Sequence, residues 1–176
     1  MISPNIDPAL TIRPEAPADR AAISEVTAAA FATLEISEHT EQFVIDALRA
    51  AGALSLSLVA EMDGRLVGHI AFSPVEISDG TADWYGLGPV SVLPELQRRG
   101  IGKALMYAGL RRMRSLGARG CCLVGHPAYY RKFGFENLDT LRFEGVPPEV
   151  FMALCFDGPL PAGTVTFHAA FTATGD

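Results

Sequence analysis

The stretch "LGPVSVLPELQRRGIGKAL", residues 87–105, joins a strand-forming run to a helical pattern. Apolar residues recur at helical spacing from Ile101 to Leu116, and Gly117 follows as a stop signal. The N-terminus of such a helix leaves backbone N–H groups unpaired and carries a partial positive charge. Gly100 and Gly102 would let an anion approach the backbone closely. We therefore expect this turn to bind a phosphate-bearing ligand.

Two familiar phosphate motifs fail at specific positions of this turn. A Walker loop needs glycine at position 97 and serine or threonine at position 104, where the chain has Gln97 and Ala104. A dinucleotide fingerprint needs a third glycine at position 105, which is Leu105. The turn therefore predicts neither ATP hydrolysis nor NAD chemistry.

The strand before the turn, "WYGLGPVSVL" at residues 84–93, contains a defect. Pro89 has no N–H to donate, and Gly86 and Gly88 offer no side chain to pack. Such a strand is predicted to carry a bulge, which frees backbone N–H groups from the sheet.

The rest of the chain predicts a mixed α/β sheet without repeats. The dipeptide Asp63-Gly64 lies between two β-rich runs in residues 54–77, which is typical of an antiparallel hairpin. The other predicted elements are a strand at 9–13, helices at 18–31 and 41–51, a buried strand at 120–125, a short helix at 127–133 ended by Gly134, and strands at 151–156 and 163–171.

Composition limits the class of protein. The 176 residues suit one domain, and their net charge of −6 argues against a nucleic-acid partner. Hydrophobic residues make up 49% of the chain, but no apolar run approaches the roughly 18 residues of a membrane span, and the N-terminal stretch lacks the blocks of a signal peptide. We expect a soluble, cytoplasmic protein. Cys121, Cys122 and Cys155 have no metal-ligand spacing, so we expect no metal site and interpret them as small hydrophobic residues.

The hexad Gln97-Arg98-Arg99-Gly100-Ile101-Gly102 resembles the pyrophosphate-binding motif of the GNAT superfamily of N-acetyltransferases. The preceding strand and turn, and the later "YYRKFGF" at 129–135, are similar to the same family in the same order. The ending of the chain looks like the YhbS-type subgroup. The resemblance implies a single domain over 1–176 with a mostly antiparallel twisted sheet of about seven strands, flanked by about four helices, in which strands 4 and 5 splay apart.

The family resemblance also implies a function, the acetyl-CoA-dependent transfer of an acetyl group to a primary amine of a small molecule or peptide. The predicted cofactor-binding residues are Val90, Ser91, Val92, Gln97, Arg98, Arg99, Gly100, Ile101, Gly102, Lys103, Tyr129 and Phe133. The N–H of Val92 is the candidate donor to the thioester carbonyl, with Val90 lining the pantetheine arm. Three alternatives stay open: a basic loop that merely caps a surface helix, a module that senses acetyl-CoA without catalysis, and an acyltransferase that uses a longer donor or a protein acceptor.

Family resemblance places a catalytic acid at Tyr130, which would protonate the coenzyme A thiolate. A phenol suits that donation, although Tyr129 is an alternative. The exposed terminal strands could pair between subunits, so a homodimer is left open. The general base is left open among six residues. The six are Glu35, Glu38, His39, Glu41, Glu95 and His126. His126 is expected chiefly to cap the following helix. The acceptor pocket is expected to form from residues 34–41 and 137–150, and the acidic residues of the first segment hint at a cationic acceptor.

Overall fold

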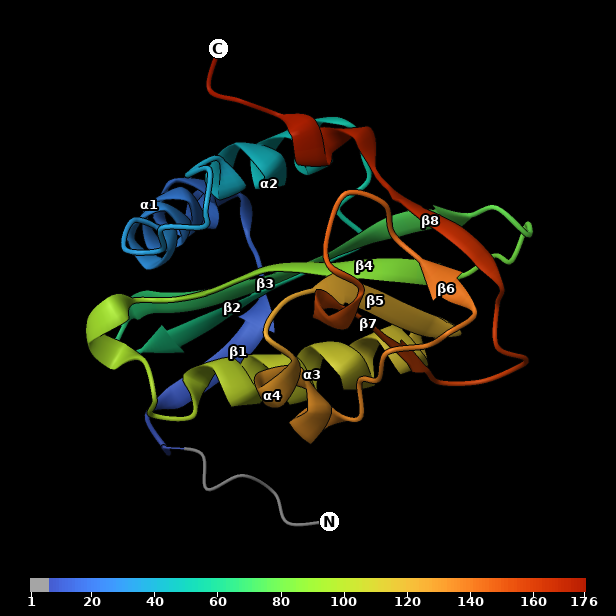
Figure 1. Cartoon of the computed structure of the whole chain (residues 1–176). Coiled ribbons are helices and arrows are strands. Elements are labelled where there is room, and N and C mark those ends of the chain that lie inside the picture. Colours follow the sequence, from blue (N-terminus) through green and yellow to red (C-terminus); the bar gives the residue numbers. More distant parts are fainter. Residues whose placement is uncertain (1–6) are drawn as a thin grey trace.

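The protein folds into an eight-stranded mixed sheet with helices on both faces (Figure 1). The structure is a computed structural model that describes residues 7–176. Residues 1–6, which belong to the N-terminal stretch without signal-peptide blocks, lie outside the described residues. Six strands follow the order β1-β2-β3-β4-β5-β7, while β8 pairs with β3 and β6 pairs with β8. The strands are β1 (Leu10–Pro14), β2 (Leu56–Met62), β3 (Arg65–Ile77), β4 (Trp84–Val92), β5 (Gly120–Val124), β6 (Leu141–Arg142), β7 (Phe151–Cys155) and β8 (Gly163–Phe167).

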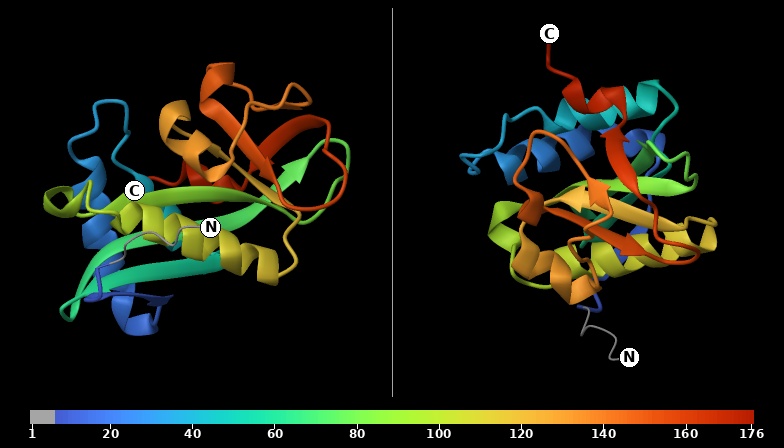
Figure 2. Two further views of the ribbon diagram at one scale, coloured as in Figure 1. Left: turned by 90° about the horizontal axis from the view of Figure 1, so that it is seen from below. Right: turned by 45° about the vertical axis from the view of Figure 1, so that its right-hand side comes forward.

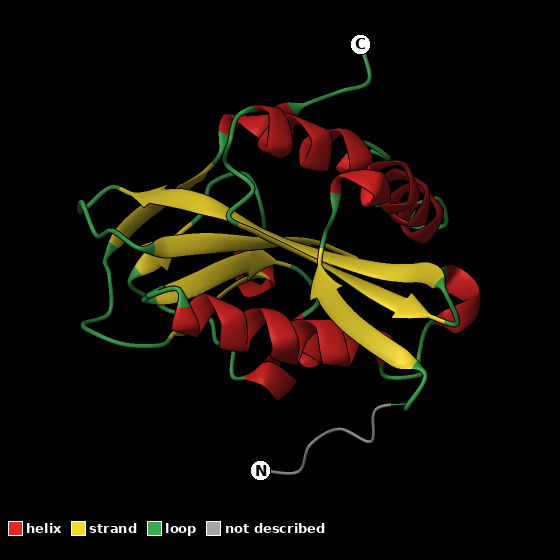
Figure 3. Cartoon of the chain, turned by 180° about the vertical axis from the view of Figure 1, so that it is seen from behind, coloured by secondary structure: helices red, strands yellow, loops and turns green. Residues whose placement is uncertain are grey.

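Four α-helices form the outer layers, two on each face of the sheet (Figure 3). They are α1 (Arg20–Phe31), α2 (Glu41–Ala50), α3 (Ile101–Ser115) and α4 (Pro127–Tyr130). Helices α1 and α2 cover one face, and α3 and α4 cover the other (Figure 1). A C-terminal 3-10 helix, Ala169–Thr172, lies beside α2 (Figure 2). Among residues 7–176, no helix is long and apolar enough to cross a membrane.

Each face of the sheet has its own core, because successive strand residues point to opposite sides. Leu58 and Phe72 lie in the cluster that includes Leu105 of α3. Val59, the neighbour of Leu58, instead packs with Ile23 of α1. The alternation therefore fixes which helices cover which face.

The hairpin and the helix stop are confirmed by the backbone. Asp63 and Gly64 both have positive φ, 51° and 77°, as a two-residue turn of the mirror-image type requires, and they connect antiparallel β2 and β3. Gly117 has φ 89° just after α3. The predicted mixed and mostly antiparallel sheet, flanked by four helices, is likewise confirmed.

Two details at the C-terminal end differ from the expectation. The sheet has one strand more than the expected seven, and the strand that was not predicted is β6, whose two residues are too few to show a periodic pattern. The predicted strand at 163–171 ends at Phe167, because His168 begins a 3-10 helix. Its Nδ1 accepts a hydrogen bond of 3.0 Å from the Ala170 N–H, which caps that turn.

The predicted bulge and splay are present in and beside β4. Between Leu87 and Val90, β4 has one residue more than the facing part of β3, from Ile70 to Phe72. On its other side, β4 pairs in parallel with β5 only from Trp84 to Gly86. Beyond Gly86 the two strands separate.

Candidate functional site

The turn into α3 presents free backbone amides. Arg98 and Gly100 adopt left-handed conformations, with φ of 64° and 86°, and the first hydrogen bond of the helix runs from the Ala104 N–H to the Gly100 carbonyl at 3.0 Å. In the part of the chain that the structure describes, no backbone carbonyl accepts from the amides of residues 98–103, and no side chain caps the helix. These N–H groups and the helix dipole together suit an anion.

Of the polar side chains of this turn, only that of Gln97 forms a hydrogen bond within the described residues. Gln97 donates its Nε2 to the Val92 carbonyl at 3.1 Å, so it ties the turn to the end of β4. Arg98, Arg99 and Lys103 are exposed and form no ion pair with any residue in 7–176. They lie around the turn as solvated positive charges.

The end of β4 offers two amides to the gap beside β5. The Leu93 N–H bonds to the Val67 carbonyl of the β3 side at 3.0 Å. Because N–H directions alternate along a strand, the Ser91 N–H also faces β3, whereas those of Val90 and Val92 face away from it. With β5 splayed, these two amides point into the gap. The Ser91 side chain is buried, and its hydroxyl has no partner among the described residues.

An aromatic cluster from α4 and the 3-10 helix after it (Arg131–Phe133) borders the same gap. A Cβ added to Gly102 would lie 3.2 Å from the Tyr129 hydroxyl oxygen, so this tyrosine reaches the first turn of α3. The Tyr130 ring lies against Gly125, where an added Cβ would overlap its edge. The two tyrosine rings have centroids 5.0 Å apart, and Phe133 packs on Tyr129 at 5.3 Å. The glycines thus allow the Tyr129 ring to approach the first turn of α3 and the Tyr130 ring to approach the chain just after β5.

Burial changes the acidity of both phenols. It raises the pKa of Tyr130 to about 12, with a smaller contribution from Tyr129, and it also raises the pKa of Tyr129. Neither hydroxyl bonds to another side chain or carbonyl in residues 7–176. Both are therefore held in the protonated form and are free to donate.

A pocket of about 490 Å³ lies on the α1–α2 side of the splay. It is bordered by the β4 bulge at 87–89, by Val124 at the end of β5, by the segment between α1 and α2, and by the C-terminal region. Its side chains include four phenylalanines and two carboxylates, Phe31, Phe143, Phe167, Phe171, Glu38 and Glu41. The structure thus brings together the two segments, 34–41 and 137–150, for which the sequence predicts an acceptor pocket.

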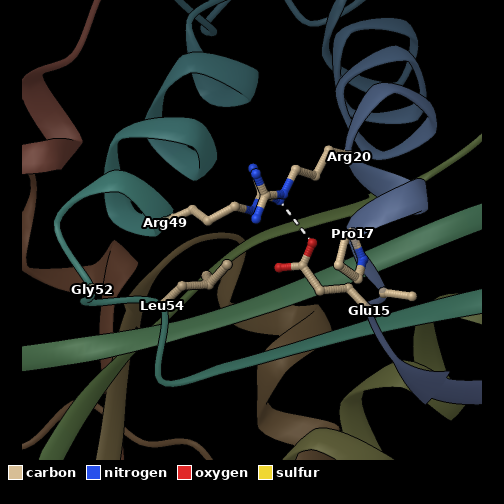
Figure 4. Close-up of a pocket in the computed structure, with 7 residues that line it drawn as sticks. Glu15, Pro17, Arg20, Arg49, Gly52 and Leu54 are labelled. Atoms are coloured by element: carbon tan, nitrogen blue, oxygen red, sulfur yellow. Dashed lines mark hydrogen bonds and ion pairs between the residues drawn. The ribbon is translucent and has the colours of Figure 1, made fainter.

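A second pocket, of about 310 Å³, lies just beyond the end of the edge strand β1 (Figure 4). Glu15, Arg20 and Arg49 line it, and Arg49 donates to Glu15 at 2.8 Å. Arg49 also pairs with Asp46 at 2.7 Å. The residues that line this pocket lie between β1 and β2 in the sequence. In the sheet, β4 is separated from β2 by β3. The pocket is an ion-paired junction between the ends of α1 and α2, separate from the splay.

The structure separates the six candidate bases. Glu38 and Glu41 line the 490 Å³ pocket. Glu95 pairs with Arg65 at 3.3 Å on the surface, and Glu35 and His39 do not line the pocket. The expectation that His126 caps α4 is wrong: it occupies the N-cap position, but its side chain makes no capping bond. The Tyr129 amide, from which a capping side chain could accept, donates to the His126 carbonyl instead.

The four pocket phenylalanines cannot be singled out from the sequence. They come from the end of α1, the loop after β6, β8 and the C-terminal 3-10 helix. No spacing links such distant positions, so only the tertiary arrangement reveals them as one surface.

Comparison with known proteins agrees with this geometry. The profile of the Acetyltransferase (GNAT) family matches residues 21–135. The uncharacterized N-acetyltransferase YhbS of Escherichia coli K12 is 33% identical over 128 residues, which cover 72% of this chain and 74% of that protein. A crystal structure of YhbS with CoA superposes with a TM-score of 0.84 at 30% identity, covering 97% of both chains.

A GNAT family acetyltransferase from Brucella melitensis, crystallised with acetyl-CoA, is 50% identical in sequence and superposes with a TM-score of 0.83. The superposition covers 92% of this chain and 97% of that one. The splayed β4 and β5, the uncapped entry to α3 and these matches lead to one conclusion: the chain belongs to the GNAT family of acetyltransferases.

Proposed function

We propose that the protein transfers the acetyl group of acetyl-CoA to a primary amine by direct attack of the amine on the thioester. The observation that carries the proposal is two groups of backbone amides near the splay: the unpaired amides of residues 98–103 at the entry to α3, and those of Val90 and Val92, which face away from β3. A pyrophosphate needs the first group of donors, and a pantetheine arm with its thioester needs the second. The binding of CoA and acetyl-CoA by the two similar structures supports the same assignment.

The residues of the β4 end and those of the α3 entry have different roles in binding and reaction. Val92 N–H donates to the thioester oxygen as negative charge develops on it, and Val90 lines the arm. Gly100 and Gly102 keep the first turn of α3 open to the phosphates. Arg98, Arg99 and Lys103 add a screened attraction from the surface.

Tyr130 serves as the acid for the departing thiolate. With a pKa of about 12, its phenol stays protonated throughout the neutral range. It gives its proton to sulfur as the carbon–sulfur bond breaks, and the proton lost by the acetylated nitrogen restores it. Tyr129 is the alternative donor, because its hydroxyl lies beside Gly102 at the same gap.

The test is the release of coenzyme A thiol from acetyl-CoA in the presence of a panel of primary amines. Amine-dependent release supports catalysis. Tight acetyl-CoA binding in calorimetry without release for any amine would instead favour a sensor, which needs the amides and the splay but no acid. Longer acyl-CoA donors and peptide amines in the same assay show whether the protein prefers a longer acyl chain or a protein acceptor.

A further inference from the structure

The pocket of about 490 Å³ carries an apolar surface that its own side chains do not fill. Phe143 and Phe167 have centroids 4.9 Å apart at 77°, and Phe167 and Phe171 are 5.3 Å apart at 56°. All three rings are only half-buried. Ile36, in the segment between α1 and α2, is 96% exposed and lines the same pocket. An apolar group entering here would cover ring faces and edges that otherwise meet water.

One carboxylate oxygen in this pocket lacks a hydrogen-bond partner among the described residues. Glu41, in the first turn of α2, accepts a hydrogen bond from the Ser37 hydroxyl with Oε1. Its Oε2 is buried and has no partner among the described residues. A buried and unpaired carboxylate oxygen is costly unless a donor satisfies it. Glu38 stands at the exposed rim, and none of the described lining residues is a lysine or arginine. Glu41 Oε2 is therefore available to accept a hydrogen bond from a cationic ligand.

The pocket adjoins the gap between β4 and β5. Gly88 and Pro89, which line it, directly precede Val90 on β4. On β5, the lining residue Val124 directly precedes Gly125, on which the Tyr130 ring lies. A molecule in the pocket is therefore next to both strands of the splay.

From these three observations we infer that the acceptor is a primary amine with an apolar arm of about the size of a phenylalkyl group, and that Glu41 binds its amino group. The inference rests on the proposed function. The ammonium loses one proton to solvent through the Glu41 carboxylate, and the neutral nitrogen forms its bond to the acetyl carbon as the carbon–sulfur bond breaks. The thiolate takes its proton from Tyr130, and the second proton of the nitrogen returns to Tyr130.

The experiment compares kcat/KM for amines of similar basicity by the release of coenzyme A thiol. The apolar members are 2-phenylethylamine and 3-phenylpropylamine, and the polar members are ethanolamine and spermidine. Burial of a phenyl group predicts at least about a tenfold advantage for the apolar members. A preference for ethanolamine or spermidine would overturn the inference and leave the proposed function standing, whereas no release with any amine would overturn both.

Two variants test the residues. Glu41→Gln keeps the shape and removes the charge, so kcat/KM for 2-phenylethylamine should fall at least about tenfold, while acetyl-CoA affinity measured by calorimetry stays the same. The control is Glu35→Gln, which removes an exposed charge from the same segment outside the pocket and should change neither quantity. Equal rates for Glu41→Gln and Glu35→Gln would refute the role of Glu41.

Phe143→Ala tests the apolar part of the pocket. Because this ring also packs on Phe151, the readout is the ratio of kcat/KM between 2-phenylethylamine and ethanolamine within the same variant, which does not depend on the amount of folded protein. The ratio should fall several-fold. An unchanged ratio would show that the apolar arm lies elsewhere.

Discussion

Replacement of Gly102 by leucine tests whether backbone amides dominate the binding of the cofactor's phosphates. A helical side chain points back toward the N-terminus and covers the turn before its own Cα. Leucine at position 102 would therefore lie over the unpaired amides of residues 98–103. Each amide–phosphate bond is charge-assisted and contributes about 1.5–3 kcal/mol. Loss of two such bonds predicts about 3–6 kcal/mol, a fall in acetyl-CoA affinity of roughly 10²–10⁴-fold.

Arg98→Ala sets the comparison. Arg98 is exposed and forms no ion pair among the described residues, so its interaction with a phosphate is screened and contributes about 1 kcal/mol or less. Its loss should weaken acetyl-CoA binding by about fivefold at most. Arg112→Ala, which removes an exposed charge from the last turn of α3, should leave binding unchanged.

Calorimetric titration of each variant with acetyl-CoA at one fixed ionic strength provides the measurement. Gly102→Ala is the size control: its Cβ would meet the Tyr129 hydroxyl at 3.2 Å and Val92 Cγ2 at 3.7 Å, contacts that a small shift relieves. It should bind within a few-fold of the wild type. A larger loss of acetyl-CoA affinity for Arg98→Ala than for Gly102→Leu would show that the Arg98 charge, and not the backbone amides, dominates phosphate binding.

The other predictions concern the acid and the core. Tyr130→Phe should lower kcat at least about tenfold with little change in acetyl-CoA affinity, and an equal or larger loss in Tyr129→Phe would move the role to Tyr129. Gly125→Ala adds a Cβ that overlaps the Tyr130 ring, so steady-state assays should show a reduced kcat although the phenol is retained; a wild-type kcat would separate the ring position from catalysis. His69 is fully buried against Ser57, its Nε2 lying 2.7 Å from the serine hydroxyl, and burial lowers its pKa to about 3. Since the folded pKa lies below the unfolded value near 6.5, stability is complete above that pH and is lost as the pH falls toward 3, by about 2 kcal/mol at pH 5. Urea titrations at pH 7 and pH 5 should show this loss in the wild type and a smaller one in His69→Gln, and equal losses would contradict it.

Local rules predict the elements around the candidate site because the relevant signals are local. The bulge follows from Pro89 and two glycines in one strand, and the helix entry follows from Gly100 and Gly102 ahead of an apolar period. Each of these features depends on neighbours within a few residues. The predicted end of the 163–171 strand is wrong because a side-chain cap at His168 competes with extended structure, which β propensity does not register.

The acceptor pocket can be placed but not characterised from the sequence. Residues 34–41 are predicted to form one wall, and residues of this segment do line it, yet nothing local distinguishes Glu41 from Glu35. The difference is one of burial, because Glu41 begins α2 and turns one oxygen inward, whereas Glu35 stays exposed. The surroundings of Glu41 include residues far away in the sequence: Phe171 of the C-terminal 3-10 helix packs with Val44 and Leu48 of α2 and lines the same pocket as Glu41.

Mass spectrometry of the reaction between trideuterated acetyl-CoA and 2-phenylethylamine shows whether the protein transfers the acetyl group to an amine. We expect an amide product that carries the labelled acetyl group on nitrogen, formed together with an equal amount of free coenzyme A and dependent on the wild-type protein. Acetyl-CoA that binds to the protein but remains an intact thioester, with this amine and with every other amine supplied, would contradict it.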